Sequence, residues 1–268
     1  MNMNDETVTR MGVVGLGVVG GTLSRAFREA GVAVRGYDSY QGVGRPEHLQ
    51  GCPVVFLCVP TPSGADGGYD LTELWNAMHS IEPHLGSGTV VVVKSTVPPG
   101  TSDRLSAAFP GLTFASMPEF LVADRPAETL TRPDRIVIGC RSARTARILA
   151  DLMGRIAPTA PVIHLRPTEA ELVKLASNAM LSAKVAEVCD RFGVDWSRVQ
   201  PGVGLHRRIG LDHLTVSPER GFGGTCLPKD LDGLIAASTA AGYRPAVLEE
   251  VASFNRRIRR AAALQSVS

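Results

Sequence analysis

The segment Arg10-Met-Gly-Val-Val-Gly15-Leu-Gly17-Val-Val-Gly20 decides the fold of this 268-residue chain. Its first six residues form an apolar run that predicts a buried strand, and Gly20 to Ala30 carries helical spacing. Three glycines spaced G-x-G-x-x-G between a strand and a helix are the fingerprint of a dinucleotide-binding turn. Gly15 permits the tight turn, Gly17 lets a pyrophosphate approach the backbone, and Gly20 lets the helix pack closely. The helix N-terminus supplies unpaired N–H groups for the phosphates.

Asp38 ends a second predicted strand, Val32–Tyr37, and lies 18 residues after Gly20. A carboxylate at this place accepts hydrogen bonds from the ribose hydroxyls and repels a 2′-phosphate, so we expect NAD rather than NADP. Arg35 and Arg45 lie nearby and reduce that contrast slightly. The residues predicted to bind the cofactor in this region are Gly15, Leu16, Gly17, Val18, Val19, Gly20 and Asp38.

Apolar runs and helical segments alternate through the first half of the chain. The further predicted strands are Pro53–Cys58, Thr89–Val93, Leu112–Ala115 and Arg135–Ile138, and the predicted helices are Leu71–Leu85 and Arg141–Ile156. Continuous apolar strands that alternate with helices indicate a parallel sheet buried on both faces.

The pattern becomes helical from Thr168 onward. Thr168-Glu-Ala-Glu171 has the spelling of a capping box, and the predicted helices are Thr168 to about Phe192, Asp230–Ala241 and Ala246–Arg260. We therefore predict an α/β fold of two domains. Residues 1–165 form a Rossmann-type, doubly wound parallel sheet that binds NAD, and residues 166–268 form an all-helical second domain that carries the Cys226 loop.

Composition argues against several classes of protein. The net charge is only +2, so nothing favours nucleic acid or a membrane surface as a partner. No apolar run reaches the roughly 18 residues that a membrane span needs. The first ten residues lack the apolar stretch of a secretory signal, which leads us to expect a cytoplasmic protein. The five cysteines include no CxxC pair, so we predict neither a disulfide framework nor a metal site.

One cysteine has an unusual setting, Gly221-Phe-Gly-Gly-Thr-Cys226-Leu-Pro-Lys229-Asp230. Consecutive glycines expose the sulfur on a loop, and a following helix together with Lys229 would favour the thiolate. A thiolate adds to an aldehyde to give a thiohemiacetal, and loss of hydride then gives a thioester that water hydrolyses to a carboxylate. Taken alone, the loop is equally compatible with a simple turn into a helix.

Other polar segments follow predicted strands directly. Cys58–Pro62, Lys94–Gly100 and Met117–Leu121 each begin where a strand ends, and ligands bind at that edge of an open α/β sheet. Lys174 and Asn178 are four residues apart, so they share one helix face and together suit a developing oxyanion. By itself this pair is more typical of an ordinary exposed helix pair than of a catalytic site.

Taken together, the motifs resemble the UDP-glucose/GDP-mannose dehydrogenase family. Its members oxidise the primary alcohol of a sugar nucleotide to a carboxylate with two NAD and release no aldehyde. The resemblance runs over about Met11 to Arg260, in the family's order and approximate spacing. The matching blocks are Gly15–Gly20 with Asp38, Cys58–Pro62, Lys94–Thr101, Pro118–Leu121, Pro133–Gly139, Ala170–Leu181 and Gly221–Leu231.

The resemblance implies a role for each matching residue. Cys226 is the nucleophile, Lys174 and Asn178 stabilise the oxyanion, Glu119 is a general base acting through water, and Thr96 and Asp230 hold that water. The implied NAD site adds Val59, Pro60, Thr61, Ser95, Thr96 and Lys229. The implied substrate site comprises Glu119, Phe120, Leu121, Lys174, Asn178, Arg208, Phe222, Gly223 and Cys226. Arg208 matches an arginine that reaches the partner subunit's substrate in some members, which implies a homodimer through the helical domain.

The chain departs from the family where the nucleotide of the substrate is held. It stops near Ser268, whereas the family continues into a second Rossmann-like domain that holds much of the UDP. Ala123 replaces a glutamate that approaches the sugar nucleotide, and Ser217–Arg220 adds about two residues before the glycine loop. Only 20 residues separate Asp38 from Cys58, so a helix is trimmed there, and the central helix is about six residues shorter before Cys189.

These departures leave alternatives open. The same chemistry on a smaller alcohol, such as a nucleoside, a nucleotide, or a phosphorylated or phosphonate alcohol, is one alternative to a nucleotide sugar. A non-catalytic NAD-binding remnant or one subunit of a hetero-oligomer is another, although intact Cys226, Lys174, Asn178 and Glu119 argue against it. A β-hydroxyacid dehydrogenase also carries a Lys and an Asn four apart, but it has no use for the Cys226 loop.

Overall fold

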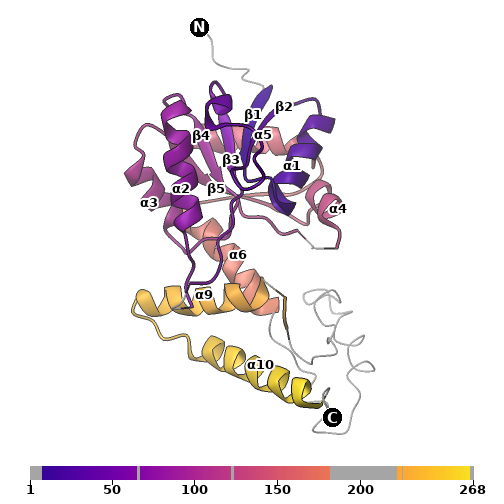
Figure 1. The fold of residues 1–268 in the computed structure, drawn as a ribbon, viewed down its shortest axis with the longest axis vertical. Helices are drawn as coiled ribbons and strands as arrows, with labels where there is room; N and C mark the ends of the chain where they lie inside the picture. The colour runs from indigo at the N-terminus through magenta and orange to yellow at the C-terminus, as the bar shows by residue number, and fades with distance from the viewer. Residues whose placement is uncertain (1–7, 65–66, 122–123, 182–221, 225, 266–268) are drawn as a thin grey trace. The chain divides into compact units, whose positions relative to one another are not determined.

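The computed structural model describes residues 8–64, 67–121, 124–181, 222–224 and 226–265 (Figure 1). The contacts within the chain divide it into two compact units. The first unit comprises Met1–Gly64 with Tyr69–Lys174, and the second comprises Ala65–Gly68 with Leu175–Ser268. The domain boundary between residues 165 and 166 stays a prediction.

A seven-stranded sheet forms the centre of the first unit, with the strand order β2-β1-β3-β4-β5-β6-β7. Its strands are β1 Arg10–Val14, β2 Ala33–Tyr37, β3 Val54–Leu57, β4 Val90–Val93, β5 Thr113–Ser116, β6 Ile136–Gly139 and β7 Val162–Leu165. The α/β fold is as predicted, and parallel pairing holds from β2 to β5 and between β6 and β7.

The sheet is mostly parallel, as predicted, and its pairing reverses at one place. Strands β5 and β6 meet as an antiparallel pair, at Ser116 and Gly139. The described part of the connection between them contains one helix, the six-residue α4 (Pro126–Thr131). The described part of this connection therefore lacks the long crossover helix that usually joins neighbouring parallel strands.

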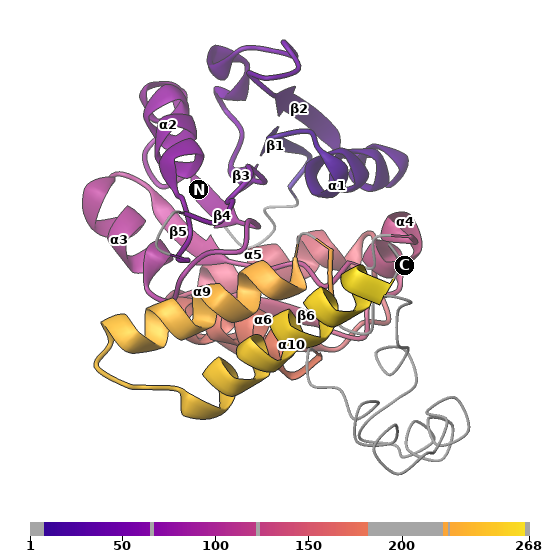
Figure 2. The ribbon, with the colours of Figure 1, turned by 60° about the horizontal axis from the view of Figure 1, so that its bottom comes forward.

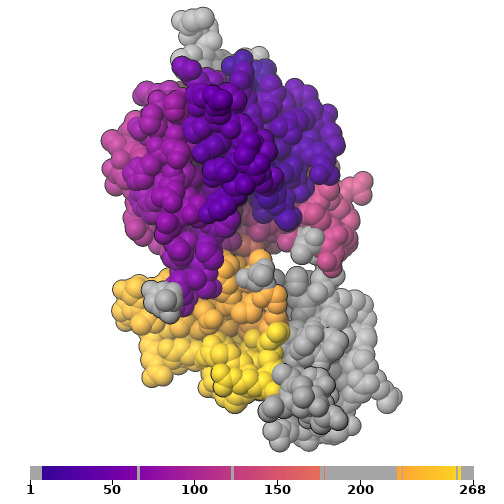
Figure 3. All heavy atoms as spheres, in the orientation of Figure 1, coloured from indigo at the N-terminus to yellow at the C-terminus, as the bar shows by residue number. Residues whose placement is uncertain are grey.

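Alternation along the strands builds two apolar layers, one on each face of the sheet. Phe56 and Val92 pack with α1 (Val18–Glu29) and α5 (Ala143–Gly154) in one buried cluster. Their strand neighbours Val55 and Val93 pack with α2 (Thr72–Ile81) and α3 (Thr101–Ala108) in the other. Helices therefore cover both faces, which Figure 1 shows, and Figure 3 shows the indigo and purple elements of this unit closely packed on the face it presents.

The connection between β2 and β3 is short, as expected from the sequence. It contains a single 3-10 turn, η1 (Pro46–Leu49), and an antiparallel bridge between Asp38 and Val43. A second 3-10 turn, η2 (Glu82–His84), follows α2 directly. Through this bridge Val43 pairs with Asp38, so the residue that follows β2 is held in place although no α-helix lies between β2 and β3.

The helix α6 (Pro167–Leu181) begins one residue earlier than predicted, and the capping box at Thr168 is wrong. The Thr168 hydroxyl donates to Oδ2 of Asp103 at 3.1 Å, and the backbone N–H of Arg166 donates to Oε2 of Glu169 at 2.7 Å. Glu171 points elsewhere, to the N-terminus of α3. The predicted continuation of this helix to Phe192 lies outside the described residues.

The second unit contains α9 (Leu227–Ala240) and α10 (Ala246–Gln265), which lie side by side in both views (Figures 1 and 2). Phe222, Leu231 and Ala252 are buried between them, with Leu234 and Leu248 packed against this cluster. Both helices agree with the sequence prediction to within a few residues. Within the described ranges no helix is long and apolar enough to cross a membrane.

Candidate active site

The glycine turn after β1 has the conformation that its spacing predicts. Gly15 has a φ of +82°, and a Cβ there would lie 2.6 Å from the carbonyl oxygen of Cys58. A Cβ on Gly20 would collide with the carbonyl oxygen of Gly15, so only glycine allows α1 to start this close to β1. At Gly17, by contrast, no protein atom lies within 4 Å of the Cβ position. The turn is thus closed by backbone at two glycines and open at the third.

Asp38 is fixed against this turn. Its Oδ2 accepts from the N–H of Leu16 at 2.7 Å, and its Oδ1 accepts from the N–H of Gln41 at 2.9 Å. The side chain is buried, so the carboxylate is held rigidly beside the start of α1. Gly17 caps α1 without any side-chain hydrogen bond. The first-turn N–H groups of a helix have no partner within the helix. An open glycine, N–H donors and a carboxylate suited to ribose hydroxyls together fit NAD.

Two loops at the carboxyl ends of β3 and β4 are joined by hydrogen bonds. The Ser95 hydroxyl donates to the carbonyl of Val59 at 2.6 Å, and the Thr61 hydroxyl donates to the carbonyl of Thr96 at 2.7 Å. Thr61 is buried, while Pro60 is exposed beside it. The five residues that the sequence assigns to the cofactor in these loops are therefore brought together as one unit.

Glu119 and Lys174 form a largely buried ion pair. The Lys174 Nζ lies 3.4 Å from Oε1 of Glu119, with the two side chains 8% and 17% exposed. The other carboxylate oxygen of Glu119 accepts from the N–H of Leu121 at 2.5 Å. Lys174 Nζ also lies 5.6 Å from the centre of the Phe120 ring, and the Arg135 guanidinium lies 4.2 Å from the same centre. Lys174 and Asn178 are both buried, which excludes an ordinary exposed helix pair.

Lys94 is a buried cation next to this pair that the sequence analysis did not assign. Burial lowers the pKa of its ammonium, and the Glu119 carboxylate opposes that shift. Burial also raises the pKa of the Cys58 thiol to about 12, so this cysteine stays protonated. Cys58 and Lys94 follow the paired residues Leu57 and Val93 of β3 and β4, which places both at the same edge of the sheet. The sequence does carry a signal that could have identified Lys94, because a charged residue that directly follows an apolar strand is unusual.

The second unit holds Asp230 by two side chains. Asn178 Nδ2 donates to Oδ2 of Asp230, and Lys229 Nζ lies 2.6 Å from Oδ1 of the same carboxylate. Asp230 is buried in the first turn of α9, and Cys226 is the exposed residue that caps this helix. The structure thus brings Asn178, Lys229 and Asp230 together, and it places Cys226 at a helix N-terminus as expected.

The backbone of the cysteine loop is anchored to α10. Asn255 accepts from the N–H of Phe222 at 2.9 Å through Oδ1 and donates to the carbonyl of Phe222 at 2.9 Å through Nδ2. The Arg259 guanidinium occupies the space that a side chain at Gly223 would take. Sequence reasoning missed Asn255 and Arg259, whose positions on a helix carry no motif. Arg208 lies outside the described residues.

Two sequence profiles match the chain. The UDP-glucose/GDP-mannose dehydrogenase family's NAD binding domain matches residues 44–157, and its central domain matches residues 168–257. UDP-glucose 6-dehydrogenase AglM of Haloferax volcanii is 35% identical over 223 residues, 75% of this chain and 51% of that protein. TuaD of Bacillus subtilis, also a UDP-glucose 6-dehydrogenase, is 34% identical over 80% of this chain and 48% of its own length. The chain spans about half the length of these curated relatives.

Solved structures show the same likeness. A UDP-glucose dehydrogenase from Pyrobaculum islandicum superimposes with a TM-score of 0.83 at 30% identity, covering 97% of this chain and 70% of that one. A UDP-D-ManNAc dehydrogenase from Pyrococcus horikoshii superimposes with a TM-score of 0.79 at 24% identity, covering 93% and 68%, and supports the fold alone.

Proposed function

Because this chain belongs to the UDP-glucose/GDP-mannose dehydrogenase family and carries its NAD-binding domain, we propose that it oxidises the primary alcohol of a nucleotide sugar to a carboxylate. The observation that carries the proposal is the buried Lys174–Glu119 pair at the carboxyl-end edge of the sheet. An ammonium and a carboxylate withdrawn from water are the groups that a developing oxyanion and an attacking water require.

In the proposed reaction, the alcohol passes its proton to water, and Lys174, assisted by Asn178, stabilises the alkoxide that forms. NAD held at the glycine turn and beside Asp38 would supply the hydride acceptor for each of the two oxidations. Between them, the Cys226 sulfur adds to the aldehyde carbon, and the carbonyl oxygen takes a proton to complete a thiohemiacetal. The second oxidation leaves a thioester on Cys226.

Hydrolysis of that thioester is the last proposed step. Glu119 takes a proton from water, and the water oxygen bonds to the acyl carbon. The C–S bond then breaks, and the proton on Glu119 passes to the sulfur to return Cys226 as a thiol. In this proposal Thr96 and Asp230 hold the water. The contacts of Asn178 and Lys229 with the Asp230 carboxylate support a fixed orientation of that carboxylate. Phe120, Leu121, Phe222, Gly223 and Arg208 contact the substrate in this proposal. Val59, Pro60, Thr61, Ser95, Thr96 and Lys229 contribute to the NAD site.

The proposal is tested by counting NADH. Purified chain is incubated with UDP-glucose and excess NAD, and NADH formed is compared with sugar nucleotide consumed; two equivalents are expected. The Cys226→Ser variant should bind NAD normally and fail to form the carboxylate. Full carboxylate formation by that variant would rule out the thioester route.

The choice of substrate is tested by the same assay on other alcohols. NAD binding without turnover of UDP-glucose, UDP-ManNAc or GDP-mannose would exclude nucleotide sugars and direct the search to smaller phosphorylated alcohols. We also propose a homodimer through the helical domain. Light scattering of the purified chain checks it, and a monomer at working concentration would contradict it.

A further inference from the structure

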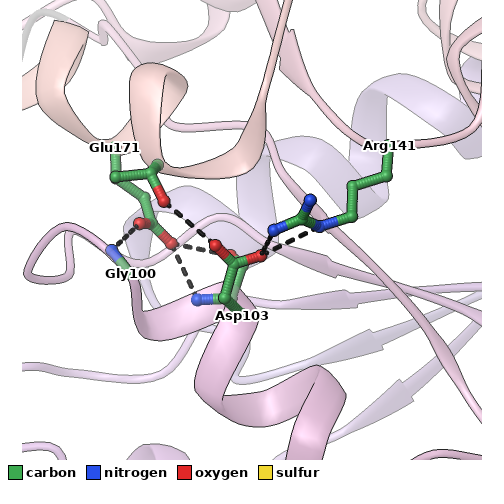
Figure 4. A network of polar contacts seen from close by, with 6 residues as sticks. Gly100, Asp103, Arg141 and Glu171 are labelled. Carbon is green, nitrogen blue, oxygen red and sulfur yellow. Dashed lines mark hydrogen bonds and ion pairs between the residues drawn. The ribbon is translucent and has the colours of Figure 1, made fainter.

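Glu171 is a buried carboxylate that the proposed reaction does not use. It lies on α6, only 2% exposed, and accepts three hydrogen bonds from the N-terminus of α3. The donors are the N–H of Gly100 at 2.6 Å, the N–H of Ser102 at 2.9 Å and the Ser102 hydroxyl at 2.7 Å. Figure 4 shows the Glu171 carboxylate turned toward Gly100. Burial raises the pKa of Glu171, while the hydrogen bonds from Ser102 and Gly100 oppose that shift.

The N-terminus of α3 is the end of a loop assigned above to the cofactor. Gly100 caps α3 in the left-handed conformation and closes the segment Lys94–Gly100 that follows β4. That segment is bonded to the loop after β3 through Ser95 and Thr61. Glu171 therefore fastens α6 to the end of the Lys94–Gly100 segment, and two of its three donors are backbone N–H groups, which cannot rotate away as side chains can.

Glu171 shares a helix face with the catalytic lysine. Lys174 is three residues further along α6, and residues three or four apart on a helix lie on the same face. One turn of a helix moves as a rigid unit. The three hydrogen bonds that hold Glu171 therefore also set the position of Lys174 along the α6 axis and the direction in which it leaves the helix. We propose that Glu171 is a positioning residue that fixes Lys174 relative to the loops Cys58–Pro62 and Lys94–Gly100. This inference rests on the proposed function for its kinetic consequence, but its geometric part does not.

A neighbouring contact of Asp103, which lies on α3, provides the matched control. Asp103 accepts from the Thr168 hydroxyl and pairs with Arg141 Nη2 at 2.9 Å (Figure 4). The Arg141 side chain is 70% exposed, and an exposed pair of this kind contributes little. Arg141→Ala thus perturbs the same network without touching the hydrogen bonds of Glu171.

The test compares Glu171→Gln with Arg141→Ala in the full-length chain. A glutamine offers one acceptor oxygen, so at least one of the three donors loses its partner. We expect kcat with UDP-glucose to fall about tenfold or more, since small displacements of a catalytic group are costly. We also expect a larger deuterium isotope effect at the oxidised carbon and a shifted pH profile. Arg141→Ala should keep all three at wild-type values, and Glu171→Asp, which keeps the charge, should restore part of the loss.

A measurement without substrate separates this proposal from the proposed function. Competitive acetylation followed by mass spectrometry reports the reactivity of Lys174 as a function of pH. Glu171→Gln should change that profile, and Arg141→Ala should not. If Glu171→Gln lowers the melting temperature but leaves Lys174 reactivity unchanged, the residue is only structural and the proposal is wrong. If the wild type turns over no nucleotide sugar, the proposed function fails while the acetylation result still decides the role of Glu171.

Should Glu171→Gln not fold, Ser102→Ala removes one donor and keeps the carboxylate. The same shift of Lys174 reactivity, smaller in size, would support the proposal, and a wild-type profile would overturn it.

Discussion

The ammonium nitrogen of Lys174 lies 3.4 Å from Oε1 of Glu119, although the two residues are 55 positions apart in the chain. Lys174 comes from α6, and Glu119 from the segment that follows β5. In a largely buried ion pair each charge depends on the other, because removing one member leaves an uncompensated buried charge. Each of the two side chains therefore stabilises the other in this largely buried position.

Lys174→Met should abolish most turnover and also weaken the fold. We expect kcat to fall on the order of 100-fold or more, since a donor to the developing oxyanion is lost. The free energy of unfolding should fall by roughly 3 kcal/mol, because Glu119 is left buried without its partner. Steady-state kinetics and urea unfolding measure the two effects.

The double variant Lys174→Met with Glu119→Gln separates these effects. It should regain part of the stability, because Glu119 no longer carries a buried charge without Lys174, but none of the activity. Recovery of activity in the double variant would contradict a chemical role for the pair.

Lys94→Met should change how the free energy of unfolding depends on pH, because burial shifts the pKa of Lys94 on folding. Burial lowers the pKa of Lys94 in the folded chain below its ordinary 10.5, so over that interval the unfolded chain binds more protons. Stability then rises with pH from the lowered pKa toward 10.5. We expect the wild type to gain free energy of unfolding relative to Lys94→Met across this window.

Urea unfolding at several pH values measures that difference, and Arg141→Ala serves as a control with the wild-type slope. The opposite sign for Lys94→Met would mean that attraction to Glu119 outweighs the cost of burial.

Buried strands were the most predictable part of the fold. Segments such as Val54–Leu57 and Val90–Val93 are continuous runs of large apolar residues, and the predictions agree within one or two positions. Strand β7 was missed because it lies at the sheet edge, where Ile163 and His164 are exposed. Helix α3 was missed because its sequence, TSDRLSAA, has a single large apolar residue, Leu105, and thus no apolar periodicity.

The positions of the candidate site residues in the fold were predictable where side-chain spacing carries the signal. Lys174 and Asn178 were expected on one helix face, and both are buried on α6. The role of Glu171 was not predictable, because its partners at Gly100 and Ser102 are about 70 residues away and include two backbone N–H groups. Backbone donors leave no residue signature, so the glutamate was instead assigned to a capping box in its own helix.

The cysteines should differ in their reaction with iodoacetamide. Cys226 is exposed at the start of α9, whereas the pKa of the Cys58 thiol is raised to about 12 by burial. At about pH 8 the thiolate is the reacting species, so Cys226 should be alkylated and Cys58 should not. Peptide mass spectrometry identifies the modified residue, and NAD titration should show unchanged binding while carboxylate formation is lost. Equal modification of Cys58 would show that its surroundings are less protected than its raised pKa implies.

Gly17→Ala and Gly20→Ala should have opposite consequences, although the two residues belong to one motif. A Cβ at Gly17 meets no protein atom within 4 Å, and its φ of −63° suits alanine. Gly17→Ala should therefore change stability by less than about 0.5 kcal/mol, yet weaken NAD binding because the new methyl group fills the space left for the pyrophosphate.

A Cβ at Gly20 collides with the Gly15 carbonyl oxygen, which is backbone and cannot rotate away. Gly20→Ala should cost roughly 1–3 kcal/mol of stability. Thermal unfolding and NAD titration measure both quantities, with Gly111→Ala as a control that leaves each unchanged, since its Cβ position is also open. Wild-type NAD affinity in Gly17→Ala would mean that the pyrophosphate does not bind at this turn.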